Sequence, residues 1–542
     1  MSTEFPLLII FILCACRDGF LNSVFGLTFD CGYAKIELSR TYGIKRYEDL
    51  IMEKAYLTYE EFGAVGDGVH DDLEAIIATH AAANEQKLPV RANDSATYYI
   101  GGKNAYASVK TSVNFGKAKF TIDDRNVEDR NSRIFIVESD YKPYEVKIDS
   151  LKKTDKKIDF PHEGNVYVKV MNDDHKMFIR RGLNLNEGVA ARDAFLVDTE
   201  GNILTDIDWD FEKITRAFAK CIDDEPIIIE GGIFTTVANE AESFYNYHNR
   251  GITVRRANVK IRDLTHYVTN EGTHGAPYGG FVTVGETAHV TIENSIFTPR
   301  FIFYTPSKIP GKGVAMGSYD ISLGESIDVK LIGVCQTVNI KDPRYWGIFT
   351  SNFCKDLYFE NCMLSRFDAH QGVTNITIKN SVFGHQCINL IGHGKAIIEN
   401  CHIYGRRLTD LRFDYGSIWD GELIVKNLKW HPSGNPEWLC LVTATNTGNH
   451  DFGYECCMPH TVTVDGLTVY DEECPDTNFY ILPDYDINRW FALPEWDNPE
   501  GKPFPYKPTE KLILKNVKFM SGREYKALER DDLYPGIVIE QE

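Results

Sequence analysis

Hydrophobic and polar residues alternate along many short segments in the C-terminal half of this 542-residue chain. Alternation with a period of two places every second side chain on one face of a β-strand, so each segment predicts a strand with one buried face. In each segment the alternating residues are followed by an asparagine, which tolerates the backbone of a tight turn. The segments are Val290–Phe297, Leu357–Leu364, Ile376–Phe383, Ala396–Ile403, Leu423–Trp430 and Leu512–Phe519, and Val462–Val469 is a variant with glycine at the turn.

The turn asparagines recur at a nearly constant spacing. Asn380 follows Asn361 by 19 residues, and Asn400 follows Asn380 by 20. A strand-bearing repeat of this length fits one coil of a parallel β-helix, in which equivalent positions stack every ~4.8 Å. Cys362 and Cys401 hold the same position two coils apart. That separation exceeds disulfide reach, so we expect both thiols to be unpaired.

A glycine-rich segment, EFGAVGDGVHDD from Glu61 to Asp72, precedes a stretch with one apolar stripe at helical spacing. Its glycines suit tight turns, and Asp71 or Asp72 can cap the helix. No Gly-Lys-Ser/Thr follows, which disfavours a phosphate-binding loop. The segment resembles the FGA-x-GDG-x-x-DD motif that opens many right-handed parallel β-helices of the pectate-lyase superfamily. The resemblance implies an all-β, right-handed parallel β-helix solenoid with an N-terminal cap helix, and a protein that binds or cuts polysaccharides.

The repeat defines the expected domain organisation. We expect the β-helix domain over residues 55–542, with the cap helix and first coils from Ala55 to about Phe120. Residues 134–220 break the pattern with hairpin-like strands, which predicts a small antiparallel β module inserted into the β-helix. Thr269–Gly285 and Phe301–Gly324 are expected to be long loops, and such loops on a rigid scaffold often shape a binding site.

Residues 1–22 resemble an export signal. The apolar run Phe5–Ala15 has about the length of a signal-peptide core and is short for a membrane span. Leu13-Cys14-Ala15-Cys16 resembles a lipoprotein processing site with Cys16 as the lipidated residue, although Glu4 stands where a basic residue is usual. We therefore expect an exported protein, whether periplasmic, cell-surface or secreted, with membrane contact only through a lipid anchor at Cys16. The alternative is a buried N-terminal segment.

The net charge and the cysteine content limit the classes of binding partner that the sequence allows. A net charge of −20 argues against nucleic acid as a partner, because phosphate binding needs a basic surface. An anionic polysaccharide stays compatible with this charge if basic side chains gather locally. The 13 cysteines contain no CxxC pair, which argues against a zinc site.

Reactive side chains are densest between Tyr345 and Glu422. Gly372, Gly394 and Gly416 recur every 22 residues, so we expect them to stack and to align the residues before them. The expected catalytic residues are Asp368, His370, His393, Arg412, Asp414 and Tyr415. The expected substrate-binding residues are Arg366, His385, Arg406, Arg407, Tyr345, Trp346 and Asn352. The alternative is a solvated sheet face with ordinary ion pairs, and the two aromatic residues can equally pack against the sheet.

Three functions stay open for this cluster. A polysaccharide lyase would remove the proton α to a uronate carboxylate, with arginine holding the carboxylate and histidine or tyrosine acting as base or acid. Enzymes of the resembled superfamily often use Ca²⁺, which is the one candidate cofactor, but no clear aspartate triplet marks a metal site. Four arginines and three histidines in one region favour the lyase.

The second function is an inverting glycoside hydrolase with two carboxylates. Asp368 and Asp414 would lie two coils apart, roughly 9–10 Å between backbones, which is nearer the inverting than the retaining separation. Asp420 and Glu422 are further candidates. The third function is a non-catalytic glycan-binding β-helix or adhesin, for which irregular coils and a single dense cluster are atypical.

Overall fold

The computed structural model describes residues 55–180, 185–242, 247–272, 278–306, 310–347, 349–444, 452–485 and 506–542. The expected export signal, Cys16 included, therefore lies outside the described residues. Within the described ranges, no helix is both long and apolar enough to cross a bilayer.

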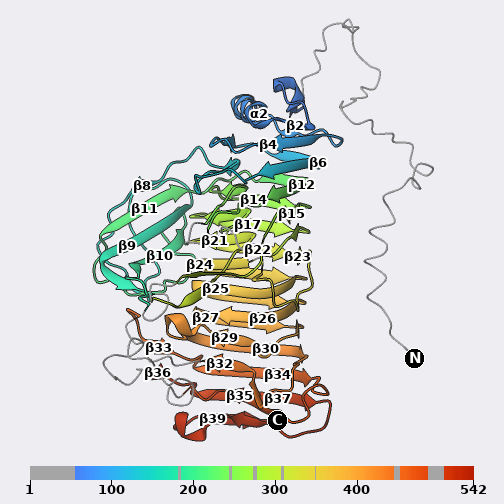
Figure 1. Cartoon of the computed structure of the whole chain (residues 1–542). Helices are drawn as coiled ribbons and strands as arrows, with labels where there is room; N and C mark the ends of the chain where they lie inside the picture. The colour runs from blue at the N-terminus through green and yellow to red at the C-terminus, as the bar shows by residue number, and fades with distance from the viewer. Residues whose placement is uncertain are drawn as a thin grey trace, which may run out of the picture. The chain divides into compact units, whose positions relative to one another are not determined.

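Parallel strands stack coil upon coil and form three faces (Figure 1). Within a coil the chain passes through face 1, then face 2, then face 3. Face 1 contains β5 (Ala107–Val109), β7 (Phe135–Val137), β13 (Ile252–Val254), β16 (Val282–Gly285), β21 (Ile321–Gly324), the beginning of β24 (Phe349–Glu360), the middle of β25 (Met363–Lys379), the end of β26 (Val382–Leu390), β29 (Thr409–Leu411) and β32 (Val442–Ala444).

Face 2 follows the first corner of each coil. It contains β1 (Leu57–Thr58), β3 (Val90–Arg91), the beginnings of β6 (Val113–Asp123) and β12 (Ile227–Val237), β14 (Val259–Arg262), β17 (Ala288–Glu293), β22 (Ile327–Ile332), the ends of β24 and β25, β27 (Gly392–Glu399), the beginnings of β30 (Trp419–Trp430), β34 (Thr461–Val469) and β37 (Lys511–Phe519), and β39 (Val538–Gln541).

Face 3 closes the coil. It contains β2 (Asp67–Asp71), β4 (Thr97–Ile100), the ends of β6 and β12, β15 (Thr265–Thr269), β18 (Ile296–Phe297), β23 (Cys335–Gln336), the beginnings of β25 and β26, β28 (His402–Ile403), and the ends of β30, β34 and β37.

The corner between faces 2 and 3 carries the repeated asparagines. Asn361, Asn380, Asn400 and Asn427 all adopt left-handed backbones, with φ between 49° and 54°. Their side chains form a ladder along the coils, because Asn400 donates to Asn380 Oδ1 at 3.2 Å and Asn427 donates to Asn400 Oδ1 at 3.1 Å. The ladder thus satisfies the amides of a turn that other residues resist.

Alternating apolar residues fill the interior of the coils, as the sequence pattern predicts. Val290, Ile292, Leu357 and Phe359 are buried, and their polar neighbours face outward. Cys362 and Cys401 are free thiols in this core, as expected.

The cap helix α2 (Leu73–Gln86) covers the N-terminal end of this core with Leu73, Ile76 and His80. Asp71 Oδ1 accepts the first helical N–H, from Leu73, at 3.1 Å. The side chain of Asp72 instead binds the glycine-rich turn, accepting the N–H of Val65 at 2.7 Å. The motif therefore holds the turn against the start of the helix. The shorter helices are η1 (Glu60–Phe62), η3 (Phe413–Tyr415) and η4 (Asp531–Leu533).

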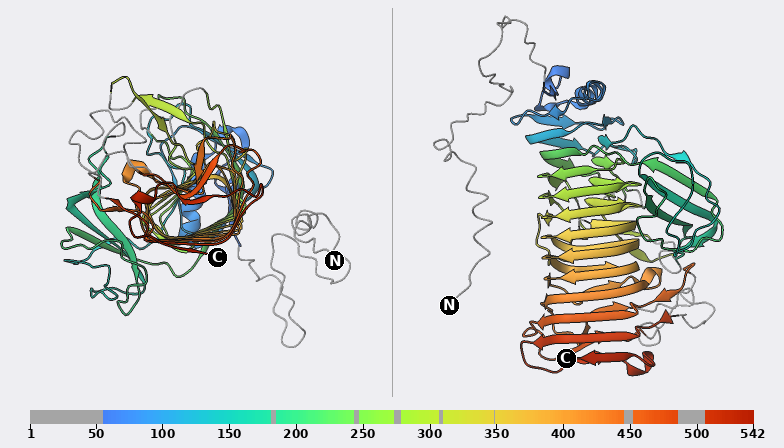
Figure 2. Two further views of the ribbon diagram at one scale, coloured as in Figure 1. Left: turned by 90° about the horizontal axis from the view of Figure 1, so that it is seen from below. Right: turned by 180° about the vertical axis from the view of Figure 1, so that it is seen from behind.

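An antiparallel sheet stands beside the coils (Figure 2). The chain leaves the coils after β7 and returns at β12, and between them it forms four strands in the order β10-β9-β11-β8. These strands are β8 (Tyr144–Glu145), β9 (Val166–Met177), β10 (Val189–Val197) and β11 (Arg216–Cys221). We call residues 138–226 the inserted module. The predicted all-β fold, a parallel β-helix with a cap helix and an inserted antiparallel module, is thus confirmed.

Three smaller sheets lie outside the faces. They are β19 (Phe303–Pro306) with β20 (Gly313–Met316), β31 (Trp438–Cys440) with β35 (Asn478–Leu482) and β38 (Lys526–Leu528), and β33 (Cys456–Cys457) with β36 (Tyr506–Lys507).

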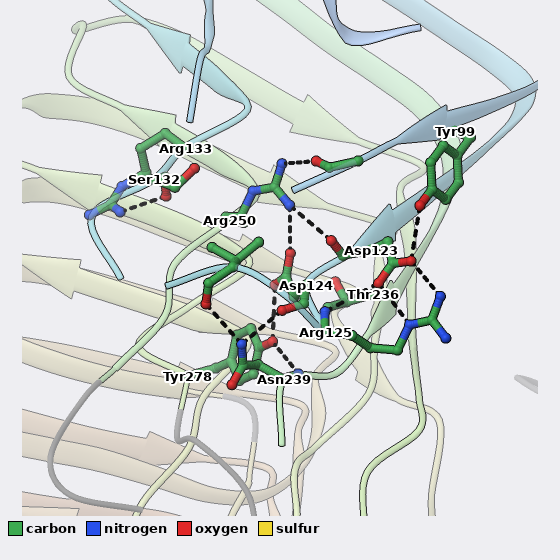
Figure 3. Close-up of polar contacts among 12 residues, drawn as sticks. Tyr99, Asp123, Asp124, Arg125, Ser132, Arg133, Thr236, Asn239, Arg250 and Tyr278 are labelled. Atoms are coloured by element: carbon green, nitrogen blue, oxygen red, sulfur yellow. Dashed lines mark hydrogen bonds and ion pairs between the residues drawn. The ribbon is translucent and has the colours of Figure 1, made fainter. Parts of the chain in front are cut away.

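Long loops connect face 3 to face 1 in the upper coils, and a buried polar cluster ties them together (Figure 3). The Asp124 carboxylate accepts from Arg250 Nη1 at 2.8 Å and from the Tyr278 hydroxyl at 2.9 Å. Asn239 donates to the backbone carbonyl of Asp124 at 2.8 Å. Because Asp124 and Arg250 are buried, this ion pair anchors loops and offers a ligand no access.

Candidate functional site

The outer side of face 1 carries polar residues in register. Thr253, Thr283, Ser322 and Thr350 occupy one line on successive coils. Further along, Asp368, Asn389, Asp410 and Thr443 form a second set of aligned partners. Most of these stacked side chains are buried, and of the eight only Thr283, Ser322 and Asp410 are partly exposed.

A second line on this face is open. Gly285, Gly324, Asn352 and Gln371 are partners on four successive coils. A Cβ added to Gly324 would meet nothing within 4 Å, and one added to Gly285 would meet only the Gly324 carbonyl oxygen at 3.8 Å. The two glycines therefore leave the surface uncrowded at their own positions, in line with Asn352 and Gln371 on the next two coils. We call these four residues the glycine strip.

His370 lies at the end of the glycine strip. Its Nδ1 is 2.9 Å from Asn352 Oδ1, and its Nε2 is 3.4 Å from Arg180 Nη2 of the inserted module. The amide oxygen only accepts, so Nδ1 carries a hydrogen and Nε2 is the ring nitrogen that faces the guanidinium. This arrangement places a base and a fixed positive charge next to each other.

An aromatic group supports this pair from below. Tyr415 is buried, and it lies edge-on to His370 and flat beneath Arg180, whose guanidinium carbon is 4.0 Å from the ring centroid. Phe178 packs against the same tyrosine and against Phe353. Both phenylalanines hold left-handed backbones, with φ of 55° and 53°, a conformation that costs bulky residues about 1–3 kcal/mol each. Such backbones persist where the surroundings demand them, often at functional sites.

Asp368 lies beneath this surface as a fully buried carboxylate. It pairs with Arg366 Nη2 at 3.0 Å and with Arg412, and it accepts the Tyr319 hydroxyl at 2.7 Å. Burial alone would raise the pKa of Asp368, but the two guanidinium groups outweigh it and hold the pKa well below its ordinary range. Asp368 is therefore a permanently ionised anchor rather than a proton donor.

His393 lies around the corner, on face 2. Its ring is edge-on to Trp209 of the inserted module, with centroids 4.5 Å apart. Its Nδ1 is 3.6 Å from Asp420 Oδ2, and Lys153 Nζ reaches the same carboxylate at 3.1 Å. His393 and Lys153 hold the pKa of Asp420 below its ordinary range. Tyr454 links the two parts, because its ring packs against both Phe178 and Trp209.

Trp346 also belongs to this region, because it lies under the guanidinium of Arg366, the partner of Asp368. Tyr345 instead stacks on Phe301, with centroids 4.9 Å apart. The side chain of Asp414 lies outside the described residues. His385 bonds the Ile340 carbonyl oxygen through Nδ1, Arg407 pairs with Asp410, and Arg406 is exposed.

The expected stacking of three glycines is wrong. Gly394 pairs with Gly421, and Gly392 pairs with Val373 and Trp419, so Gly416 has no place in that row. The coil from His393 to its partner Asp420 spans 27 residues because it contains η3 and its flanking turns. A uniform spacing of 22 residues therefore misplaces the positions after Gly394.

Sequence reasoning missed the contribution of the inserted module. Arg180, Phe178 and Trp209 come from segments that lie about 180 residues or more before their partners. The spacing of residues in the sequence does not predict contacts between segments so far apart, so Arg180 was not among the expected site residues. Within the described ranges, no group of three or more His, Cys, Asp or Glu side chains is arranged to hold a metal ion.

The fold defines a class, the parallel β-helix proteins, and no family model and no curated protein matches the chain. Among solved structures, it is similar to the tailspike gp61 of Pseudomonas phage phi297, with 11% identity over 86% of this chain and 80% of that chain, and a TM-score of 0.48. The tailspike gp49 of Pseudomonas phage LKA1 shows 14% identity over 85% and 81%, with a TM-score of 0.44. PfbA, a surface adhesin of Streptococcus pneumoniae, shows 13% identity over 79% and 90%, with a TM-score of 0.39. The class therefore rests on the sheet topology itself.

Proposed function

We propose that this protein is a polysaccharide lyase that cleaves a uronate-containing glycan by β-elimination. The observation that carries the proposal is the position of the His370 imidazole, whose Nδ1 is bound by Asn352 while its Nε2 faces Arg180, at the end of the glycine strip. A base beside a fixed cation is the pair that this reaction needs.

In the proposed reaction the glycan lies along the glycine strip, and Arg180 binds the uronate carboxylate. His370 Nε2 removes the C5 proton, and the guanidinium stabilises the charge that develops on the carboxylate. The electron pair then forms the C4=C5 double bond as the C4–O4 bond breaks. The departing oxygen takes up a proton from solvent. Tyr415 is buried, so it positions His370 and Arg180 rather than meeting the substrate.

A two-carboxylate hydrolase fits the described residues less well. Such an enzyme needs a protonated carboxylic acid at the glycosidic oxygen. Asp368 and Asp420 are both held ionised by neighbouring cations, and Asp368 is buried as well. Cleavage of an extracellular polymer also accords with the export signal and the lipid anchor at Cys16 that the sequence predicts, and we propose a secreted or cell-surface location.

The test follows two products of each reaction across uronate-containing and neutral polysaccharides. Ultraviolet absorbance reports the new double bond, and a reducing-end assay reports chain cleavage. We expect both signals in equal amounts, and we expect His370→Gln to lower kcat by about 10²–10⁴-fold, the usual contribution of a general base. His402→Gln is the matched control, because His402 lies on face 3 against His431.

Three outcomes would redirect the proposal. Reducing ends without absorbance would establish a hydrolase. Saturable glycan binding without either signal would establish a binding protein of the adhesin kind. Because His370 and Arg180 supply the base and the charge, EDTA is expected to leave the activity unchanged; a loss that Ca²⁺ restores would give calcium the role proposed for Arg180.

A further inference from the structure

A buried lysine joins the inserted module to the coils next to the candidate site. Lys355 stands where β24 enters face 2, and its side chain is 1% exposed. Its Nζ lies 2.6 Å from Asp193 Oδ1 and 3.2 Å from Asp208 Oδ1, and both aspartates belong to the module. We call Lys355, Asp193 and Asp208 the docking triad.

The docking triad fixes a three-residue segment of the module. Lys355 also donates to the carbonyl oxygen of Asp206. On the next coil, Thr374 donates to Asp208 Oδ1 at 2.8 Å and Asn375 donates to Asp206 Oδ2 at 3.0 Å. Side chains from two neighbouring coils therefore bind the carboxylates of both Asp206 and Asp208.

Trp209 follows this segment directly. Thr374 and His393 are partners on adjacent strands, so the residue that binds Asp208 lies one rung above the histidine that Trp209 contacts. A shift of residues 206–208 would move the indole off His393 and away from Tyr454. The position of Trp209 is thus set by the docking triad.

The charges of the docking triad indicate that it does more than hold the inserted module against the coils. One ammonium group faces two carboxylates, and Lys355 and Asp193 are almost entirely removed from water. Buried charges are costly, and apolar residues of similar volume often bind two surfaces equally well or better. Charge-assisted hydrogen bonds differ from apolar contacts in that they accept few geometries.

We propose that Lys355 is a positioning residue of the candidate site: through Asp208 it places Trp209 against His393 without itself touching the glycan. The inference rests on the proposed function only where it predicts an effect of Lys355 on lyase activity. The contact between Trp209 and His393 can be followed with no glycan present.

The experiment measures the emission of Trp209 in the full chain, taken as the difference between each protein and its Trp209→Phe counterpart. In the parent protein the indole of Trp209 is partly buried against His393, with ring centroids 4.5 Å apart. Lys355→Met is expected to shift the emission to longer wavelength as the indole leaves His393 and meets more water. Lys355→Arg, which keeps the charge, is expected to give a smaller shift.

Lys169→Met is the matched control. Lys169 also bridges module and coils, at 2.5 Å from Glu286 and 2.6 Å from Glu325, but it does not contact residues 206–208. It should leave the Trp209 emission unchanged. An unchanged emission in Lys355→Met would overturn the proposal, as would equal shifts in both variants.

A second variant keeps the test decisive if Lys355→Met does not fold. Thr374→Val has nearly the same volume and removes only the hydroxyl bound to Asp208. It should shift the emission in the same direction by a smaller amount, and an unshifted spectrum would contradict the proposal. If a glycan substrate is found, Lys355→Met should lower kcat/KM, whereas a chain without lyase activity would leave the emission result intact.

Discussion

The carboxylate of Asp368 is the most constrained charge on face 1, because two guanidinium groups and a hydroxyl surround it and water does not reach it. Its environment favours an anchoring role for Asp368, which the sequence predicts as catalytic. Asp368, His370, Arg412 and Tyr415 do lie in one region with Asn352, and their catalytic roles stay predictions. Their roles depended on burial, which sequence spacing does not report.

Asp368→Asn tests the anchor at the residue scale. The amide has nearly the same volume but leaves Arg366 and Arg412 facing a neutral partner in a dry site, so we expect stability to fall by about 3–5 kcal/mol. The midpoint of thermal unfolding measures the loss. Asp532→Asn is the control, because Asp532 is exposed in its ion pair with Arg530 and the change should be small. Equal effects of both substitutions would contradict the buried-anchor account.

At the scale of elements, the turn asparagines were the most reliable feature of the sequence. Their spacing predicted the coil length and the corner between faces 2 and 3, because only residues tolerant of positive φ can stack there. The row of glycines failed for a related reason. A glycine accommodates many backbones, so equal spacing of Gly372, Gly394 and Gly416 carried no information on register, and the coil that contains η3 is longer than its neighbours.

Substitutions at Asn400 test the ladder. Asn400→Ala should destabilise the protein by about 1–2 kcal/mol, because alanine resists the left-handed backbone and the ladder loses two hydrogen bonds. Asn400→Gly keeps the backbone freedom and loses only the hydrogen bonds, so it should cost less. Urea unfolding of the three proteins separates the effect of the backbone from that of the hydrogen bonds. A glycine variant as unstable as the alanine variant would assign most of the loss to the side-chain ladder.

The docking triad links the stability of the inserted module to pH. Burial and the neighbouring Asp208 raise the pKa of Asp193 to about 7, against the opposing effect of Lys355. Among the described residues, Tyr167 also senses this carboxylate, because the charge of Asp193 helps to raise the pKa of Tyr167. The folded protein then holds a proton that the unfolded chain releases near pH 4. The stabilising contribution is therefore complete below about pH 4 and is lost as pH rises through about 7.

Asp193→Asn removes this titration. We expect the stability of the variant, relative to that of the parent protein, to improve steadily between about pH 4 and pH 7. Urea unfolding at a series of pH values measures the difference. Asp198→Asn, in an exposed turn of the same module, is the control and should give a nearly constant difference over this window. A constant difference for Asp193→Asn too would show that its carboxylate titrates normally.

For the molecule as a whole, the net charge of −20 and the proposed polyanionic substrate oppose each other. Long-range repulsion slows the approach of a polyuronate, whereas Arg180 acts only at contact. Screening should therefore help: kcat/KM on a long polymer should rise as salt increases from about 0.01 to 0.1 M, with kcat unchanged. A short oligosaccharide carries less charge and should respond less. A steady fall of kcat/KM with salt would mean that local attraction dominates instead.

The coils could be predicted from sequence because each one repeats a local rule, whereas the site depends on contacts between segments that share no rule. Arg180 meets His370 and Trp209 meets His393 only because the inserted module folds back along later coils. Nothing in the order of residues along the module indicates those partners. The repeating coils can thus be predicted from the sequence alone, whereas a site built from distant segments cannot.

The place where the module enters the coils has a consequence for how such a protein can change. The strands on either side of the insertion, β6 with β12 and β7 with β13, pair directly as neighbouring rungs. The two ends of the insertion are therefore already held together, and the entropy of closing a loop grows only slowly with its length. A different module inserted between the same rungs would replace Arg180 beside an unaltered His370 and Trp209 beside an unaltered His393. Recombination that exchanges the inserted module would then change the glycan preference and leave the stacked coils unaltered.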